Sequence, residues 1–185
     1  GMGVDIHLNK RLPMGAGLGG GSSDAATTLH ALNRLWQLGF ERQQLAEIGL
    51  KLGADVPVFI HGFAAFAEGI GEQLTPVDIE QPWYLVITPH VHVSTAEIFQ
   101  DLELTRDCPT IKIRDLPDSG WDNVCTPVVV KHYPQVGEAL EVLGQYAQAR
   151  MSGTGASVFA AFDSEAAAQA VYVKLPEEWT GFIAK

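Results

Sequence analysis

The residues best suited to chemistry lie in a glycine-rich segment near the start of the chain, residues 13–26. Its sequence is PMGAGLGGGSSDAA, and six of the seven residues 15–21 are Gly or Ala. Such a backbone can approach a ligand closely and turn its N–H groups toward it. A helix pattern follows, and the positive end of that helix would face the same place. The segment therefore predicts an anion site, with phosphate as the expected ligand and Ser22 and Ser23 as hydroxyl contacts.

Three general interpretations of this segment can be weighed from the residues alone. A Walker A loop needs a lysine directly before Ser or Thr, and Gly21 precedes Ser22, so that loop is excluded. The dinucleotide pattern GxGxxG is present at Gly15, Gly17 and Gly20. However, a second helix pattern stands where that fold needs a strand ending in an acid. A flexible turn without a ligand is disfavoured because so many glycines are costly in conformational entropy.

A fourth interpretation comes from resemblance. The segment is similar to the ATP-binding signature of the GHMP small-molecule kinases, through its Pro, its Gly-Leu-Gly core and its Ser-Ser-x-Ala helix start. Residues 53–59, GADVPVF, resemble the part that carries the family's catalytic aspartate, and residues 150–159, RMSGTGASVF, resemble its C-terminal glycine motif. Within the family, GLGGGSSDAA and GADVPVF most resemble members that phosphorylate the 2-hydroxyl of a cytidine diphosphate-linked methylerythritol. That ATP-dependent step belongs to non-mevalonate isoprenoid biosynthesis.

The resemblance implies roles around the transferred phosphate. Asp55 would be the catalytic base that accepts the proton of the attacking hydroxyl, although an aspartate in such a turn is by itself more often a turn or cap residue. Ser22 and Ser23 would also contact Mg²⁺, with helix capping as their alternative role. The expected ATP-binding residues are Pro13, Gly15, Gly17, Leu18, Gly19, Gly20, Gly21, Ser22 and Ser23.

The resemblance also implies a substrate-binding group. Thr95 and Phe99 are spaced i, i+4, so they share one face of a short helix. Phe99 would pack on the cytosine ring, and a place in the core is its alternative. The turn formed by Gly153, Thr154 and Gly155 would lie near the ATP phosphates or the substrate, and a simple strand-entry turn is the alternative. Asn123 resembles a family asparagine at a helix start, where it could equally be a cap.

The elements that must position these residues mix helices and strands without a strict alternation, which favours an α+β fold. The resemblance implies the GHMP kinase fold, with part of a ribosomal S5 domain 2-like ATP-binding domain at 1–80 and a ferredoxin-like α/β sandwich at 81–185. The expected strands are 3–10, 56–60, 63–68, a strand ending near 77, 83–88, 158–162 and 182–184. The expected helices are 22–38, 41–52, 95–100, 123–132, 135–147 and 164–174, with a loop at 101–120.

Composition sets further limits. Against 12 Lys and Arg stand 22 Asp and Glu, for a net charge of −10, which argues against a nucleic-acid partner. No 18-residue apolar run predicts a membrane span. The two cysteines, Cys108 and Cys125, have no metal-site spacing and indicate a reducing cytoplasm. His90 and His92 share a face but lack a visible third ligand for a metal.

One family feature is not found in this sequence. The family opens with a Pro-x-Lys-x-Asn-like segment whose lysine pairs with the catalytic aspartate, and nothing comparable precedes Val4. We therefore expect missing sequence at both ends, an inactive fragment, and self-association through the exposed edge of strand 3–10. Lys10 and Arg11 flank the glycines and could touch phosphates or face solvent. A homoserine-type or mevalonate-type kinase and a non-catalytic nucleotide-binding module remain alternatives.

Overall fold

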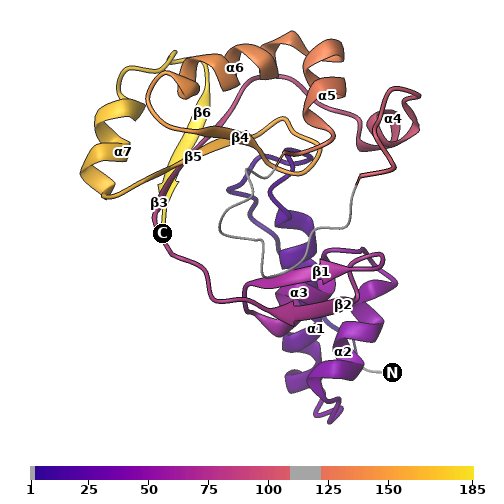
Figure 1. The fold of residues 1–185 in the computed structure, drawn as a ribbon. Helices are drawn as coiled ribbons and strands as arrows, with labels where there is room; N and C mark the ends of the chain where they lie inside the picture. Colours follow the sequence, from indigo (N-terminus) through magenta and orange to yellow (C-terminus); the bar gives the residue numbers. More distant parts are fainter. Residues whose placement is uncertain (1–2, 109–121) are drawn as a thin grey trace. The chain divides into compact units, whose positions relative to one another are not determined.

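The computed structural model describes residues 3–108 and 122–185, and these divide into two compact units (Figure 1). One unit contains Gly1–Met14 and Gly19–Ile79, and the other contains Gly15–Leu18 and Glu80–Lys185. The glycine-rich segment therefore contributes residues to both units. Most of the loop predicted at 101–120 lies outside the described residues.

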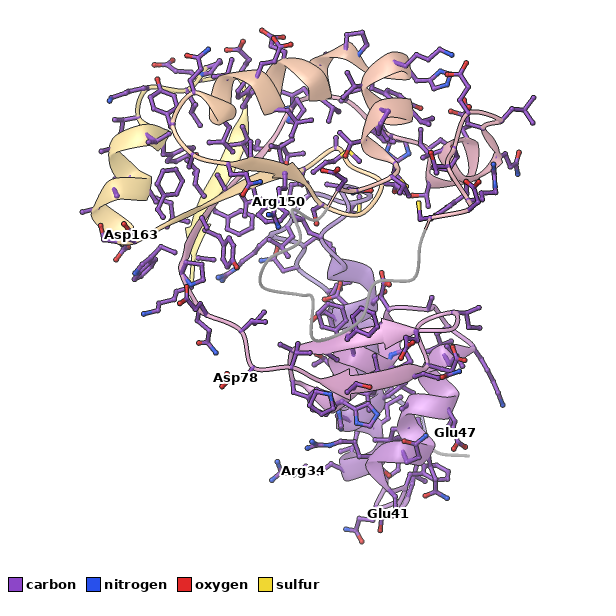
Figure 2. The ribbon with its side chains drawn as sticks, viewed as in Figure 1. Arg34, Glu41, Glu47, Asp78, Arg150 and Asp163 are labelled. Atoms are coloured by element: carbon purple, nitrogen blue, oxygen red, sulfur yellow. The ribbon has the colours of Figure 1, made fainter. Side chains whose placement is uncertain are left out.

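Within its described residues, the first unit forms three helices and a β-hairpin (Figure 1). Glu41, labelled in Figure 2, begins the second helix with a capping box in which it and Gln44 bind each other's backbone N–H groups. A small core holds the helices together, formed by Ala26, Leu45, Ala46, Val56 and Ile60. The elements are α1 (Gly20–Leu35), α2 (Arg42–Leu50), α3 (Val56–His61), β1 (Ala65–Glu68) and β2 (Gln73–Pro76).

Two predicted strands of this unit are wrong. Residues 56–60 form helix α3, because a short apolar run suits either element and Pro57 is well placed in the first turn of a helix. Residues 3–10 have no strand pairing among the described residues, and the expected buried positions Val4, Ile6 and Leu8 are exposed. A strand needs a neighbour in hydrogen-bond register, which alternation in the sequence cannot supply.

The boundaries of the first helix also differ from the prediction. Helix α1 begins at Gly20, not after Ser22, because Gly19 adopts a left-handed φ of 64° and takes the N-cap position. Ser22 therefore lies inside the first turn. The helix ends at Leu35, before the predicted Leu38, and Gln37 has a positive φ of 51° just beyond its end.

The second unit contains a four-stranded antiparallel sheet in the order β4-β5-β3-β6. Along the chain the strands and helices follow a split β-α-β pattern, so the predicted ferredoxin-like sandwich is confirmed. The elements are β3 (Trp83–Thr88), α4 (Thr95–Gln100), α5 (Thr126–His132), α6 (Pro134–Gly144), β4 (Ala149–Met151), β5 (Val158–Phe162), α7 (Glu165–Tyr172) and β6 (Thr180–Ala184).

The core of the second unit lies between one face of this sheet and its helices. Leu85 and Ile87 of β3 alternate toward it and are fully buried, together with Leu143 of α6 and Ala168 of α7. The predicted helices at 95–100 and 164–174 are present, and a serine caps each: Ser94 accepts the Glu97 N–H before α4, and Ser164 accepts the Ala167 N–H before α7. In the part of the chain that the structure describes, no helix is long and apolar enough to cross a membrane.

Candidate active site

The first half of the glycine-rich segment packs on the C-terminal glycine turn, within the second unit. The Ser152 hydroxyl donates to the Gly17 carbonyl oxygen at 2.7 Å, and the Ser157 N–H donates to the Ala16 carbonyl oxygen at 3.1 Å. Gly17 has a φ of 76°, and a Cβ there would lie 2.1 Å from the Ser152 carbonyl oxygen. Glycine is therefore required at this position by both conformation and space.

The second half of the segment forms the start of α1, within the first unit. Gly19 occupies the N-cap without a side chain, and a Cβ there would lie 2.9 Å from the Phe59 ring. The backbone N–H groups of Gly20, Gly21 and Ser22 come before the first intrahelical bond, in which the Ser23 N–H donates to the Gly19 carbonyl. The first turn thus points N–H groups outward with no side-chain cap from Gly19, an arrangement that fits a phosphate group.

A lysine lies against this helix start. Lys10 forms an ion pair with Asp24 of α1, and the side chains are 26% and 34% exposed. Its Nζ is also 3.6 Å from the place that a Cβ on Gly20 would occupy. The sequence alone allowed Lys10 either to contact phosphate or to face solvent. It did not predict the ion pair with Asp24. The one signal in the sequence that could have indicated this ion pair is the opposite charge of two residues fourteen positions apart.

Asp55 stands at the turn before α3, also within the first unit. It occupies the N-cap position, but its side chain makes no capping hydrogen bond and so does not stabilise the helix in that way. The residue is exposed. Buried Val56 and Pro57 fix the turn that follows. A Cβ on Gly53 would lie 3.9 Å from the Ser22 hydroxyl, so the Asp55 turn and the start of α1 are neighbours.

The second glycine turn is joined to the start of α4. The Thr154 and Thr95 hydroxyls are 2.9 Å apart, so these two predicted substrate contacts do come together. Asn123 donates from its amide to the carbonyl oxygens of Met151 at 3.2 Å and Gly153 at 2.6 Å. Its carbonyl oxygen accepts the Cys125 N–H at 3.0 Å. Asn123 therefore both supports the start of α5 and braces the glycine turn.

The remaining candidate residues are Phe99, the two histidines and the two cysteines. Phe99 on α4 is 57% exposed, so the alternative that it belongs to the core is wrong. His92 lies beside Gly15, where a Cβ would be 2.9 Å from its ring. Among the described residues, no three His, Cys, Asp or Glu side chains form a metal-binding group. Both cysteines are free, and burial raises the pKa of the Cys125 thiol, which keeps it protonated and unreactive.

The predicted site residues thus form two groups, one in each unit. The first unit brings together the start of α1 and the Asp55 turn. The second unit brings together the glycine turn, Thr95 and the first part of the loop. The first group is Pro13, Gly19, Gly20, Gly21, Ser22, Ser23 and Asp55; the second is Gly15, Gly17, Leu18, Thr95, Phe99, Gly153, Thr154 and Gly155.

Two family models match this chain. A family described as GHMP kinases N terminal domain matches residues 1–63, and one described as GHMP kinases C terminal matches residues 112–181. The chain belongs to the GHMP kinase family. Together the two matches include the glycine-rich segment, Asp55 and the C-terminal glycine turn.

Curated relatives extend the family assignment. The chain is 60% identical over 184 residues to the 4-diphosphocytidyl-2-C-methyl-D-erythritol kinase of Pseudomonas syringae pv. syringae (strain B728a). It is 59% identical over 184 residues to the enzyme of the same name from Shewanella pealeana (strain ATCC 700345 / ANG-SQ1). Both alignments cover 100% of this chain and 65% of the relative, so this GHMP chain spans about two thirds of the relatives' length.

Solved structures of the family agree with the fold. A crystal structure of 4-(cytidine 5'-diphospho)-2C-methyl-D-erythritol kinase matches with a TM-score of 0.80 and 28% identity, covering 94% of this chain and 67% of that one. A homoserine kinase from Cytophaga hutchinsonii matches with a TM-score of 0.57 and 15% identity, covering 95% and 68%. The second match shows the shared GHMP fold alone.

Proposed function

We propose that this chain is part of an ATP-dependent kinase that phosphorylates the 2-hydroxyl of 4-diphosphocytidyl-2-C-methyl-D-erythritol. The observation that carries the proposal is 60% identity, over the whole chain, to a kinase named for that substrate. The step would serve non-mevalonate isoprenoid biosynthesis. Residues 1–80 would belong to the ATP-binding domain and residues 81–185 to the C-terminal domain.

In the proposed reaction, Asp55 is the general base. Its carboxylate takes the proton from the substrate hydroxyl as that oxygen attacks the γ-phosphorus of ATP, and the bond from phosphorus to the β–γ bridging oxygen breaks to release ADP. The absence of a capping hydrogen bond at the Asp55 side chain supports this role, because its oxygens are not used to hold α3.

The glycine-rich segment binds the ATP phosphates in this proposal. Pro13, Gly15, Gly17 and Leu18 shape the first half of the loop, and Gly19 to Ser23 supply N–H and hydroxyl groups at the start of α1. The N–H groups of Gly20, Gly21 and Ser22 support it, since they precede the first intrahelical hydrogen bond of α1. Ser22 and Ser23 would hold Mg²⁺, which supplies neutralisation of the phosphate charge.

The second unit binds the cytidine end of the substrate in this proposal. Phe99 stacks on the cytosine ring, and the exposed aromatic surface of Phe99 supports that role. Thr95, Gly153, Thr154 and Gly155 line the same place. The 2.9 Å contact between the Thr95 and Thr154 hydroxyls supports their grouping.

The proposal also includes the state of the 185-residue chain. The exposed apolar side chains Val4, Ile6 and Leu8 favour self-association through residues 3–10, which light scattering after size-exclusion chromatography would measure. A cytoplasmic location is proposed because both cysteines are free thiols.

Phosphoryl transfer tests the proposed function. A version of the chain preceded by the family's lysine-bearing segment is incubated with ATP, Mg²⁺ and one of three alcohols: the cytidylylated methylerythritol, homoserine or mevalonate. Product formation is followed by ³¹P NMR. Transfer to the cytidylylated substrate alone is expected. Transfer to homoserine or mevalonate instead would assign the chain to another type of GHMP kinase.

A further inference from the structure

Helix α4 presents Phe99 to solvent from a short element that is held at several points. The helix has only six residues, and Ile98 alone among them is buried in the core. Short isolated helices are unstable in water, so α4 depends on contacts outside its own backbone. The orientation of the Phe99 ring therefore depends on what fixes the backbone at the C-terminal end of α4.

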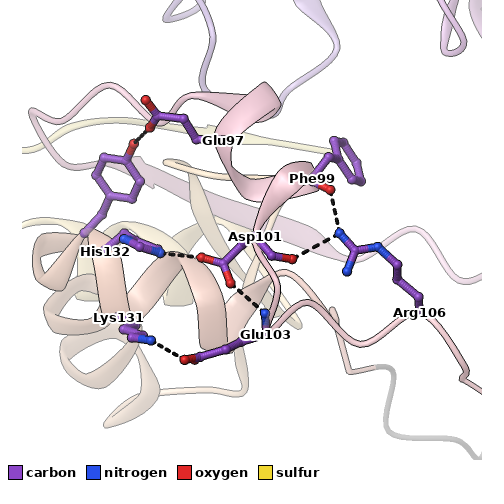
Figure 3. Close-up of polar contacts among 8 residues, drawn as sticks. Glu97, Phe99, Asp101, Glu103, Arg106, Lys131 and His132 are labelled. Carbon is purple, nitrogen blue, oxygen red and sulfur yellow. Dashed lines mark hydrogen bonds and ion pairs between the residues drawn. The ribbon is translucent and has the colours of Figure 1, made fainter.

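Three consecutive residues at the end of α5 bind acidic side chains of α4 and the segment after it (Figure 3). Lys131 Nζ is 2.5 Å from a carboxylate oxygen of Glu103, and His132 Nε2 is 2.6 Å from Asp101 Oδ2. The Tyr133 hydroxyl donates to Glu97 at 3.0 Å. These contacts attach the flank of α4 to α5, but none of them reaches the backbone of Phe99 itself.

Arg106 makes the contact that does reach Phe99. One guanidinium nitrogen donates to the Phe99 carbonyl oxygen at 2.7 Å and to the Asp101 carbonyl oxygen at 3.0 Å. The other donates to the Leu104 carbonyl oxygen at 3.1 Å. The last carbonyl groups of a helix have no intrahelical partner, and a cation near them is favourable. Arg106 thus closes the C-terminal end of α4 at the residue whose ring is exposed.

We infer that Arg106 is a positioning residue for Phe99, which fixes the aromatic platform for the substrate's cytosine by binding the Phe99 carbonyl oxygen. This inference rests on the proposed function, in which the Phe99 ring stacks on cytosine. Arg106 does not touch the reacting atoms. It lowers the cost of binding by holding the ring in its working orientation before the ligand arrives.

A double-mutant cycle tests the inference in the version of the chain preceded by the family's lysine-bearing segment, with cytidine 5'-diphosphate as the probe and calorimetry as the readout. Arg106→Met keeps the apolar stem and removes the donors. We expect Phe99→Ala to weaken binding about tenfold, as for loss of one stacking partner, and Arg106→Met about fivefold. The double variant should bind no more than about twofold more weakly than Phe99→Ala, because Arg106 acts through the ring.

A matched control comes from the first unit. Arg42 donates to the His61 carbonyl oxygen at 3.1 Å, so it closes the C-terminal end of α3 as Arg106 closes α4. Arg42→Met should leave the affinity for cytidine diphosphate unchanged. If Arg106→Met weakens binding by the same factor with and without Phe99, the two residues act independently and the inference is overturned.

A second readout needs no ligand. Hydrogen exchange of the backbone amides of residues 98–101 should be at least about threefold faster in Arg106→Met than in the parent chain, while α6 is unchanged. Unchanged exchange at α4 would overturn the inference. If the version preceded by the lysine-bearing segment binds no cytidine diphosphate, the proposed function is contradicted, and the exchange measurement still decides whether Arg106 holds α4.

Discussion

Residues 15–21 and residues 152–157 are both glycine-rich turns with positive φ angles, but their polar side chains are used differently. In the second turn every hydroxyl is engaged: Ser152 with the Gly17 carbonyl, Thr154 with Thr95, and Ser157 with Thr88 at 2.8 Å. The first turn leads into α1, whose opening N–H groups precede the first intrahelical bond. The hydroxyl groups of residues 152–157 thus hold neighbouring segments in place, whereas the N–H groups at the start of α1 are available to a ligand.

Burial follows the same division. Thr154 and Ser157 are buried, and an unpaired hydroxyl there would be costly. Gly21 and Asp55 are exposed, so their polar groups can be solvated until a ligand replaces the water. Mutations in the second turn, and at Gly17 where the first turn packs on it, should therefore act mainly on stability. Mutations of the exposed groups at the start of α1 and of Asp55 should act mainly on binding or turnover.

The largest expected loss of stability is at the junction of the two turns. Gly17→Ala places a methyl group 2.1 Å from the Ser152 carbonyl oxygen at a positive φ, and should destabilise the chain by about 3 kcal/mol or more. Gly21→Ala is the control, since nothing lies within 4 Å of its Cβ position and its φ is not positive. Urea denaturation measures both. Equal stability of the two variants would show that the turns are not in contact.

The next effect is expected at Asn123, which braces the second turn. Asn123→Ala removes hydrogen bonds to Met151, Gly153 and Cys125 and should cost about 2 kcal/mol of unfolding free energy. Asn33→Ala is a suitable comparison, because Asn33 makes a similar exposed pair of bonds to Phe40 in the first unit. A loss at Asn123 no greater than at Asn33 would argue against the brace.

A smaller effect is expected at Ser152. Ser152→Ala removes one hydrogen bond, to the Gly17 carbonyl, and should cost about 1 kcal/mol. Thermal unfolding should show the loss, and nucleotide affinity should fall as well, because this hydrogen bond holds the Gly17 carbonyl of the first turn. Nucleotide affinity that is unchanged while stability falls would show that the first turn does not need the second.

The smallest effect concerns pH and the segment after α4. The Glu103 N–H, followed by His132, lowers the pKa of the Asp101 carboxyl below its usual value. A lowered pKa in the folded state means that the stabilisation is present above the unfolded pKa and is lost as the pH falls through the folded value. The Tm difference between the parent chain and Asp101→Asn should therefore shrink below about pH 4. A difference that is constant from pH 3 to 6 would contradict this assignment.

Local signals in the sequence predicted many elements correctly. The caps Ser94 and Ser164 and the apolar run of β3 are each contained in a few neighbouring residues, and their elements are confirmed. Residues 56–60 failed because β-branched apolar residues fit a strand as well as a buried helix. Residues 3–10 failed because the alternation of side chains says nothing about a pairing partner.

The contacts of the candidate site could be predicted less well. The two glycine motifs were recognised separately, but Gly17 and Ser152 are 135 residues apart, and no local pattern joins them. The Lys10–Asp24 and Arg106–Phe99 contacts are nearer in sequence, yet long side chains have many possible partners. Motif similarity predicted which residues belong to the candidate site, but their contacts could be read only from the folded structure.

Turnover by an Asp55 variant is the most direct test of the proposed kinase. In a version preceded by the family's lysine-bearing segment, ADP release is measured with the cytidylylated methylerythritol for the parent and Asp55→Asn. We predict a kcat at least about 10²-fold lower in the variant, with nucleotide Kd and Tm nearly unchanged. A variant with near-parent turnover would show that Asp55 is only a turn residue and would contradict its proposed role as the general base.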